Sequence, residues 1–92
     1  MEITDDDVRN FRNMLANRLL ILRIICGISR EELCEILEMD IDIYATYEYG
    51  IANYKQSEVD KICEFYGADA DIITMGGVND FRRVLEEIMD EE

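Results

Sequence analysis

Apolar residues recur at steps of three and four along almost the whole chain, and no proline interrupts them. This spacing places apolar side chains on one face of an α-helix, and proline is the residue that most strongly breaks helices. The hydrophobic share of 49% is enough for a globular core. A chain of 92 residues has room for one modest core. The sequence therefore predicts an all-α domain.

Capping residues and glycines divide the pattern into six expected helices. Ser, Thr, Asp and Asn favour helix N-termini, and glycine favours the left-handed conformation that ends helices. We expect Glu32 to complete a capping box with Ser29. The expected helices start near Asp5–Asp7, at Ser29, Asp40, Ser57 and Asp69, and after Gly77. Their expected ends are Gly27, a turn over residues 38–40, Gly50, Gly67 and Gly76.

The chain is strongly acidic. It has 22 acidic and nine basic residues, a net charge of −13. A DNA-binding domain gains much of its affinity by neutralising phosphates with Lys and Arg, so this balance disfavours DNA as a ligand. Two interpretations stay open: the charge keeps the protein soluble, or it attracts a basic partner.

Little in the sequence indicates catalysis, a metal or a membrane. There is no histidine, no CxxC pair and no phosphate-cradling glycine loop. We expect no catalytic residues, no cofactor and no metal site, and buried, reduced thiols at Cys26, Cys34 and Cys63. No apolar run reaches the roughly 20 residues that span a bilayer, and the N-terminus is acidic. We therefore expect a cytoplasmic protein without membrane contact.

Three motifs carry a resemblance to a known family. The run "GISREELCEILEMD", the "YEYG" after it and the later "ICEFYGADADII" occur in the order and spacing of the lambda-repressor/Cro-like, or XRE-type, helix-turn-helix domain. The resemblance covers Asn17 to Met75. It implies a five-helix domain over residues 1–75, with an extended first helix and the helix-turn-helix at about 29–50. Residues 76–92 would add a C-terminal amphipathic, acidic helix.

The resemblance also implies where a ligand would bind. In that family the start of the third helix reads bases, and Arg30 occupies a position close to a phosphate. The implied recognition surface comprises Arg30, Asp40, Ile41, Asp42, Ile43, Ala45, Thr46 and Tyr49. Base reading relies mainly on Arg, Lys, Asn and Gln. The positions implied to read bases are Ile41, Asp42, Ile43, Ala45 and Thr46, and none of them carries such a residue.

This altered surface favours a protein ligand. Isoleucines and tyrosines among acidic residues resemble the composition of a protein interface, although part of this surface can instead be ordinary or partly buried. We expect a regulatory protein that binds a basic DNA-binding protein, as an antirepressor or a DNA mimic. The alternative is a dimeric, sequence-specific transcriptional repressor. An enzyme is not expected.

The last expected helix predicts self-association. One stripe of the segment carries Phe81, Val84, Leu85 and Ile88. A two-fold interface needs only one such patch, used twice, so we expect a homodimer. The alternative is that the stripe packs onto the core of its own chain.

Overall fold

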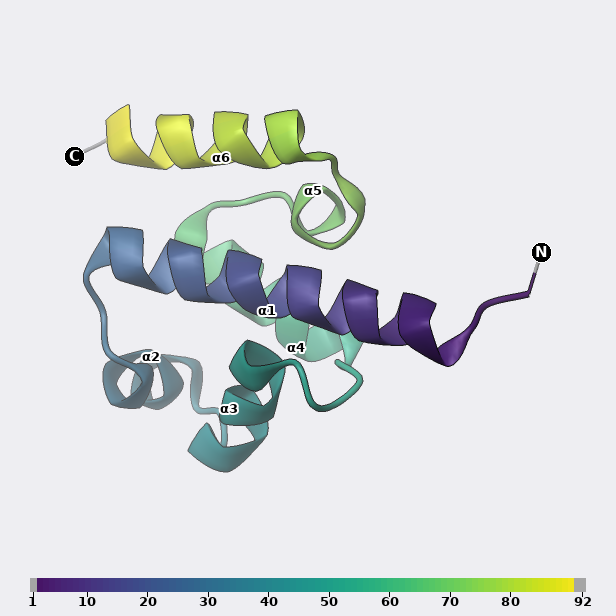
Figure 1. The fold of residues 1–92 in the computed structure, drawn as a ribbon. Helices are drawn as coiled ribbons and strands as arrows, with labels where there is room; N and C mark the ends of the chain where they lie inside the picture. Colours follow the sequence, from purple (N-terminus) through teal and green to yellow (C-terminus); the bar gives the residue numbers. More distant parts are fainter. Residues whose placement is uncertain (1, 91–92) are drawn as a thin grey trace. The chain divides into compact units, whose positions relative to one another are not determined.

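The computed structural model describes residues 2–90, and these residues are all-helical. No strand occurs among them, which confirms the prediction of an all-α domain (Figure 1). The six helices are α1 (Asp5–Cys26), α2 (Arg30–Leu37), α3 (Ile41–Tyr49), α4 (Gln56–Tyr66), α5 (Ala70–Met75) and α6 (Val78–Asp90).

The chain divides into two compact units. The first ends at Tyr54 and holds α1, α2 and α3; the second begins at Lys55 and holds α4, α5 and α6. The boundary expected at residues 75–76 lies inside the second unit. The candidate recognition surface belongs entirely to the first unit.

Helix α1 begins with a cap that the sequence reading did not identify. The hydroxyl of Thr4 accepts a hydrogen bond from the N–H of Asp7, and the Asp7 carboxylate accepts one from the N–H of Thr4. This is a complete capping box. The helix ends as predicted at Gly27, whose φ is +66°.

Helix α2 has the predicted cap residue but only half of the predicted capping box. The hydroxyl of Ser29 accepts from the N–H of Glu32 at 3.1 Å. The Glu32 carboxylate does not reach back to the backbone; it accepts from the Ser29 hydroxyl at 3.0 Å. The prediction of a reciprocal bond from the Ser29 backbone to the Glu32 carboxylate is therefore wrong.

The turn between α2 and α3 is short and well capped. Glu38 ends α2 in the left-handed conformation, with φ at 53°. Asp40 then caps α3 as predicted, because its carboxylate accepts from the N–H groups of Asp42 and Ile43. Three residues thus suffice to turn the chain from one helix into the next.

Helix α3 packs against α1. The buried face of α3 holds Tyr44 and Tyr47, as their three-residue spacing predicts. Gly50 ends α3 at a φ of +70° and lies directly against α1. A Cβ there would lie 2.9 Å from Oδ1 of Asn13 and 3.3 Å from the carbonyl oxygen of Arg12. A side chain there would displace the Asn13 side chain and crowd the carbonyl of Arg12, so the close approach favours glycine in addition to its backbone angle.

In the second unit, the predicted start of α4 is wrong by two residues. Ser57 was expected as the cap, but α4 begins at Gln56 and the preceding Lys55 makes no side-chain cap bond. The amide of Gln56 donates to the Asp60 carboxylate four residues on, and such pairs support an additional helical turn. Gly67 and Asp69 end α4 and begin α5 as predicted.

The cysteines largely behave as predicted. Cys34 and Cys63 are buried, Cys26 is only partly buried, and all three are thiols. Burial raises the pKa of the Cys63 thiol to about 12 and also raises that of Cys34. Both buried thiols therefore stay protonated at neutral pH and act as small apolar core residues.

Candidate interaction surface

The structure places the predicted recognition residues on α2, on α3 and at their junction. Ile41, Ile43 and Tyr49 are 38%, 44% and 57% exposed. The exposed members of the set are Asp40, Ile41, Asp42, Ile43 and Tyr49, whereas Arg30, Ala45 and Thr46 are partly exposed. None of them is buried, so the whole set is accessible from solvent.

Helix α3 has two opposite faces. Tyr44, Tyr47 and Glu48 are buried. Asp42 and Tyr49 lie on the other side, seven residues or nearly two helical turns apart. The short side chains of Ala45 and Thr46 lie between them. The outer face is thus a narrow stripe with a carboxylate at one end and an aromatic ring at the other.

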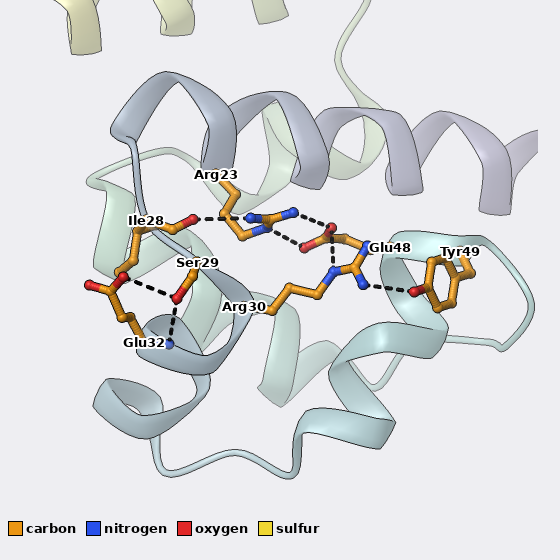
Figure 2. A network of polar contacts seen from close by, with 7 residues as sticks. All are labelled: Arg23, Ile28, Ser29, Arg30, Glu32, Glu48 and Tyr49. Atoms are coloured by element: carbon orange, nitrogen blue, oxygen red, sulfur yellow. Dashed lines mark hydrogen bonds and ion pairs between the residues drawn. The ribbon is translucent and has the colours of Figure 1, made fainter.

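The buried carboxylate of Glu48 binds two arginine side chains from neighbouring helices (Figure 2). Its side chain is only 1% exposed. Arg23 of α1 donates to both of its oxygens, at 2.9 and 3.1 Å, and Arg30 of α2 donates to one of them at 3.1 Å. Arg23 also donates to the carbonyl of Ile28 at 3.1 Å. The Glu48 carboxylate therefore connects α1, α2 and α3 through hydrogen bonds.

The electrostatics of Glu48 follow from these contacts. Burial alone would raise its pKa, but hydrogen bonds, with that from Arg23 the strongest, outweigh burial and lower it. The hydrogen bond with Glu48 in turn raises the pKa of Arg23 and of Arg30. Glu48 is therefore ionised in the folded protein, as a paired buried carboxylate should be.

Arg30 is occupied by contacts within the chain. Besides Glu48, its Nη1 donates to the hydroxyl of Tyr49 at 2.7 Å, and its guanidinium carbon lies 4.7 Å from the centre of the Tyr49 ring. The family resemblance implies that Arg30 lies close to a phosphate. In the structure, an arriving phosphate would have to compete with a buried carboxylate for this side chain.

The exposed surface of α2 and α3 is acidic. No Lys or Arg occurs between Arg30 and Lys55. Exposed apolar side chains are set among these acids, and Ile36 and Ile51 are 57% and 66% exposed. The exposed acids of the two helices and their junction are Glu31, Glu32, Glu35, Glu38, Asp40 and Asp42.

The other arginines of the first unit have contacts of their own or are buried. Arg12 donates two hydrogen bonds to the side-chain oxygen of Asn53, at 2.9 and 2.7 Å. Arg18 is buried. Arg9 is exposed and lies 3.7 Å from a carboxylate oxygen of Asp6. Within residues 2–54, each arginine is thus buried or in contact with an acceptor of its own unit.

The predicted dimer stripe on α6 is partly buried within the single chain. Phe81 and Val84 are buried, and Leu85 and Ile88 are partly exposed. Val84 and Ile88 line a hollow of about 180 Å³ together with Tyr66 and Ile72. Part of the stripe therefore packs within its own unit, which leaves Leu85, Ile88 and the exposed Met89 for a second copy.

Neither a metal site nor a membrane span occurs in the described part of the chain. Residues 2–90 contain no group of three or more Cys, Asp or Glu side chains arranged to hold a metal ion. None of their helices combines the length and the apolarity that crossing a bilayer requires.

Sequence reasoning missed the role of Glu48. Glu48 is not among the predicted recognition residues, and neither its burial nor its two arginine partners was predicted. The local signal was its place four residues after Tyr44, which puts a charged side chain on the buried face of α3. Its partners, 25 and 18 residues earlier in the chain, carried no local signal.

Comparisons with models of protein families, with curated proteins and with solved structures found no match for this chain.

Proposed function

We propose that this protein is a regulator of the lambda-repressor/Cro-like, XRE-type helix-turn-helix class that binds a basic DNA-binding protein instead of DNA. In this proposal α2 and α3 are the two helices of the motif. Their short, capped junction and the packing of Tyr44 and Tyr47 on the buried side of α3 support that assignment. A similar fold does not by itself determine function, so the proposal depends on the exposed residues of α2 and α3.

The observation that carries it is the combination of exposed acids and exposed isoleucines on α2 and α3. A duplex would meet six carboxylates there and no free guanidinium from Arg23 or Arg30, which are bound to Glu48. A basic protein would meet opposite charge around apolar anchors, which is the usual layout of an interface. The partner would therefore use on this protein the surface that it uses on DNA.

The experiment begins with capture of the partner from a nuclease-treated extract of the source cells. The partner is identified by mass spectrometry and purified, and its fluorescent DNA complex is titrated with this protein. We expect the protein to release the DNA. A variant with Glu35→Lys and Asp42→Lys should fail, because it places two positive charges on the proposed surface.

The control carries the same change of charge elsewhere. Glu64→Lys with Glu86→Lys alters two exposed acids of the second unit, and it should release DNA like the wild type. Equal loss in both variants would show that net charge, and not this surface, is responsible.

A direct titration separates the proposal from its alternative, a dimeric DNA-binding repressor. Duplex DNA is mixed with the protein at about 50 and 200 mM salt, because the affinity of a DNA-binding protein falls steeply over that range. We expect no appreciable binding at the higher salt. A submicromolar, salt-sensitive complex would support the repressor and contradict the proposal.

A further inference from the structure

The side chain of Tyr49 is exposed and yet held in place. The residue is 57% exposed, while its hydroxyl accepts a hydrogen bond from Arg30 and its ring lies against the same guanidinium. An exposed side chain normally loses conformational freedom when a partner binds it. A ring that is already held loses less, which favours it as an interface anchor.

The contact that holds Tyr49 is itself anchored in the protein interior. Nε of Arg30 donates to Glu48, whose buried carboxylate is bound by Arg23 of α1 (Figure 2). Charge-assisted hydrogen bonds of this kind are among the stronger ones in proteins. The orientation of the exposed ring is thus linked through two arginines to the longest helix of the unit.

The outer stripe of α3 offers a matching place for one long cationic side chain. Asp42 lies about 10 Å from Tyr49 along the helix, and the small Ala45 lies between them. The aliphatic part of an arginine can lie on apolar surface while its charged end reaches a carboxylate. No basic residue between positions 31 and 54 supplies such a side chain from within the chain.

We propose that Tyr49, positioned by Arg30, is the anchor for an arginine side chain of the basic partner. The arginine stem packs against the ring over Ala45, and its guanidinium binds the Asp42 carboxylate. Binding of both carboxylate oxygens by one guanidinium is a geometry that lysine cannot reproduce. This inference rests on the proposed function and names the contact within it.

The test uses a displayed library of random twelve-residue peptides, selected on the wild-type protein. We expect the enriched peptides to share an arginine. Their binding to Tyr49→Ala should be at least about 30-fold weaker than to the wild type, as for the removal of an interface anchor. Phe65→Ala is the control, because Phe65 is also an exposed aromatic residue but belongs to the second unit, and its removal should leave affinity unchanged.

The positioning role of Arg30 has its own readout. Arg30→Lys keeps the charge but cannot hold Glu48 and Tyr49 with one planar group. We expect the ring of Tyr49 to become mobile in this variant, observed as lower NMR order of its ring carbons, with weaker peptide binding. Tyr49→Phe keeps the ring and loses the hydroxyl bond, and we expect an intermediate affinity.

The outcomes separate this inference from the proposed function. Arginine-containing peptides that bind wild type and Tyr49→Ala equally would contradict the role of Tyr49 as an anchor but would still agree with a basic partner. Peptides that need Tyr49 but contain neither Arg nor Lys would overturn the arginine contact and count against a basic partner. If no peptide is enriched over the Tyr49→Ala protein, the anchor is overturned, and the DNA-release experiment still decides the proposed function.

Discussion

At the scale of single residues, Glu48 connects more of the first unit than any residue that the sequence singled out for function. Its carboxylate is bound by Arg23 and Arg30, and Arg30 in turn binds Tyr49. Removing one member of a buried ion pair is costly because the remaining charges lose their partner. Glu48 therefore contributes to stability and also to the arrangement of the exposed surface.

We expect Glu48→Gln to destabilise the fold by about 2–4 kcal/mol, because two arginines lose their anionic partner. Urea denaturation followed by circular dichroism measures this. Glu35→Gln is the control, since Glu35 is exposed and should change stability by less than about 0.5 kcal/mol. Equal effects of the two substitutions would show that the buried pair adds nothing.

The contribution of Glu48 should depend on pH with a defined sign. Its pKa is lowered from the ordinary value of 4.5 in the folded protein, so the unfolded chain binds this proton more tightly. The stabilisation is complete above pH 4.5 and is lost as the pH falls through the lowered folded-state pKa. The difference in unfolding free energy between wild type and Glu48→Gln should be constant from pH 7 to about 5 and should shrink below 4.5. A difference that grows on acidification would contradict the assignment.

Residues with local signals were predictable, and residues with distant partners were not. Asp40, Gly50 and Tyr44 were placed correctly because caps and helical spacing depend on neighbours within a few positions. The partners of Glu48 come from two other helices. The contact of Arg30 with Tyr49 likewise depends on how α2 and α3 pack, which no short window of sequence contains.

At the scale of helices, the first unit depends on a close approach of α3 to α1. Gly50 ends α3 where a side chain would meet Asn13 and the backbone of Arg12. Gly27 ends α1 with nearly the same φ, but no atom lies within 4 Å of the position that its Cβ would take. The two glycines therefore differ in crowding and hardly at all in backbone angle.

This pair provides an internal comparison. Gly27→Ala should cost about 1 kcal/mol, the usual penalty for a non-glycine residue in the left-handed region. Gly50→Ala should cost at least about 1 kcal/mol more, because crowding in a packed site adds to that penalty. Thermal and urea unfolding of both variants measure the difference. Equal losses would mean that α3 is not packed against α1 at Gly50.

Helix boundaries show the limits of local rules. Six helices were expected and six are described in residues 2–90, yet α4 begins without the predicted cap at Ser57. The sequence between Gly50 and Val59 contains several polar residues that could each begin a helix. The capping box of Thr4 and Asp7 was readable, because its i, i+3 spacing is a known N-terminal signature.

At the scale of the whole molecule, the net charge was known from the sequence, but the use of the positive charges was not. The arginines of residues 2–54 are buried or contact acceptors of their own unit. Their number alone would have allowed a basic face. Only the folded arrangement shows that Arg23 and Arg30 are both bound to the buried carboxylate of Glu48.

The homodimer expected from α6 stays a prediction, and the surface available for it is smaller than the full stripe. Since Phe81 and Val84 are buried in one chain, a second copy would meet mainly Leu85 and Ile88. Ile88→Glu should then convert a dimer into a folded monomer at tens of micromolar, measured by analytical ultracentrifugation with circular dichroism as the check on folding. A wild-type protein that sediments as a monomer at that concentration would rule the dimer out.

The left-handed backbone of Glu38 points to a trade-off between stability and function. Glycine is the residue that this helix end favours, so Glu38→Gly should raise the unfolding free energy by about 1 kcal/mol. The same change removes a carboxylate from the acidic junction of α2 and α3 and should weaken release of DNA from the partner. A glycine variant that is more stable and releases DNA as well as the wild type would show that the Glu38 carboxylate does not contribute to partner binding.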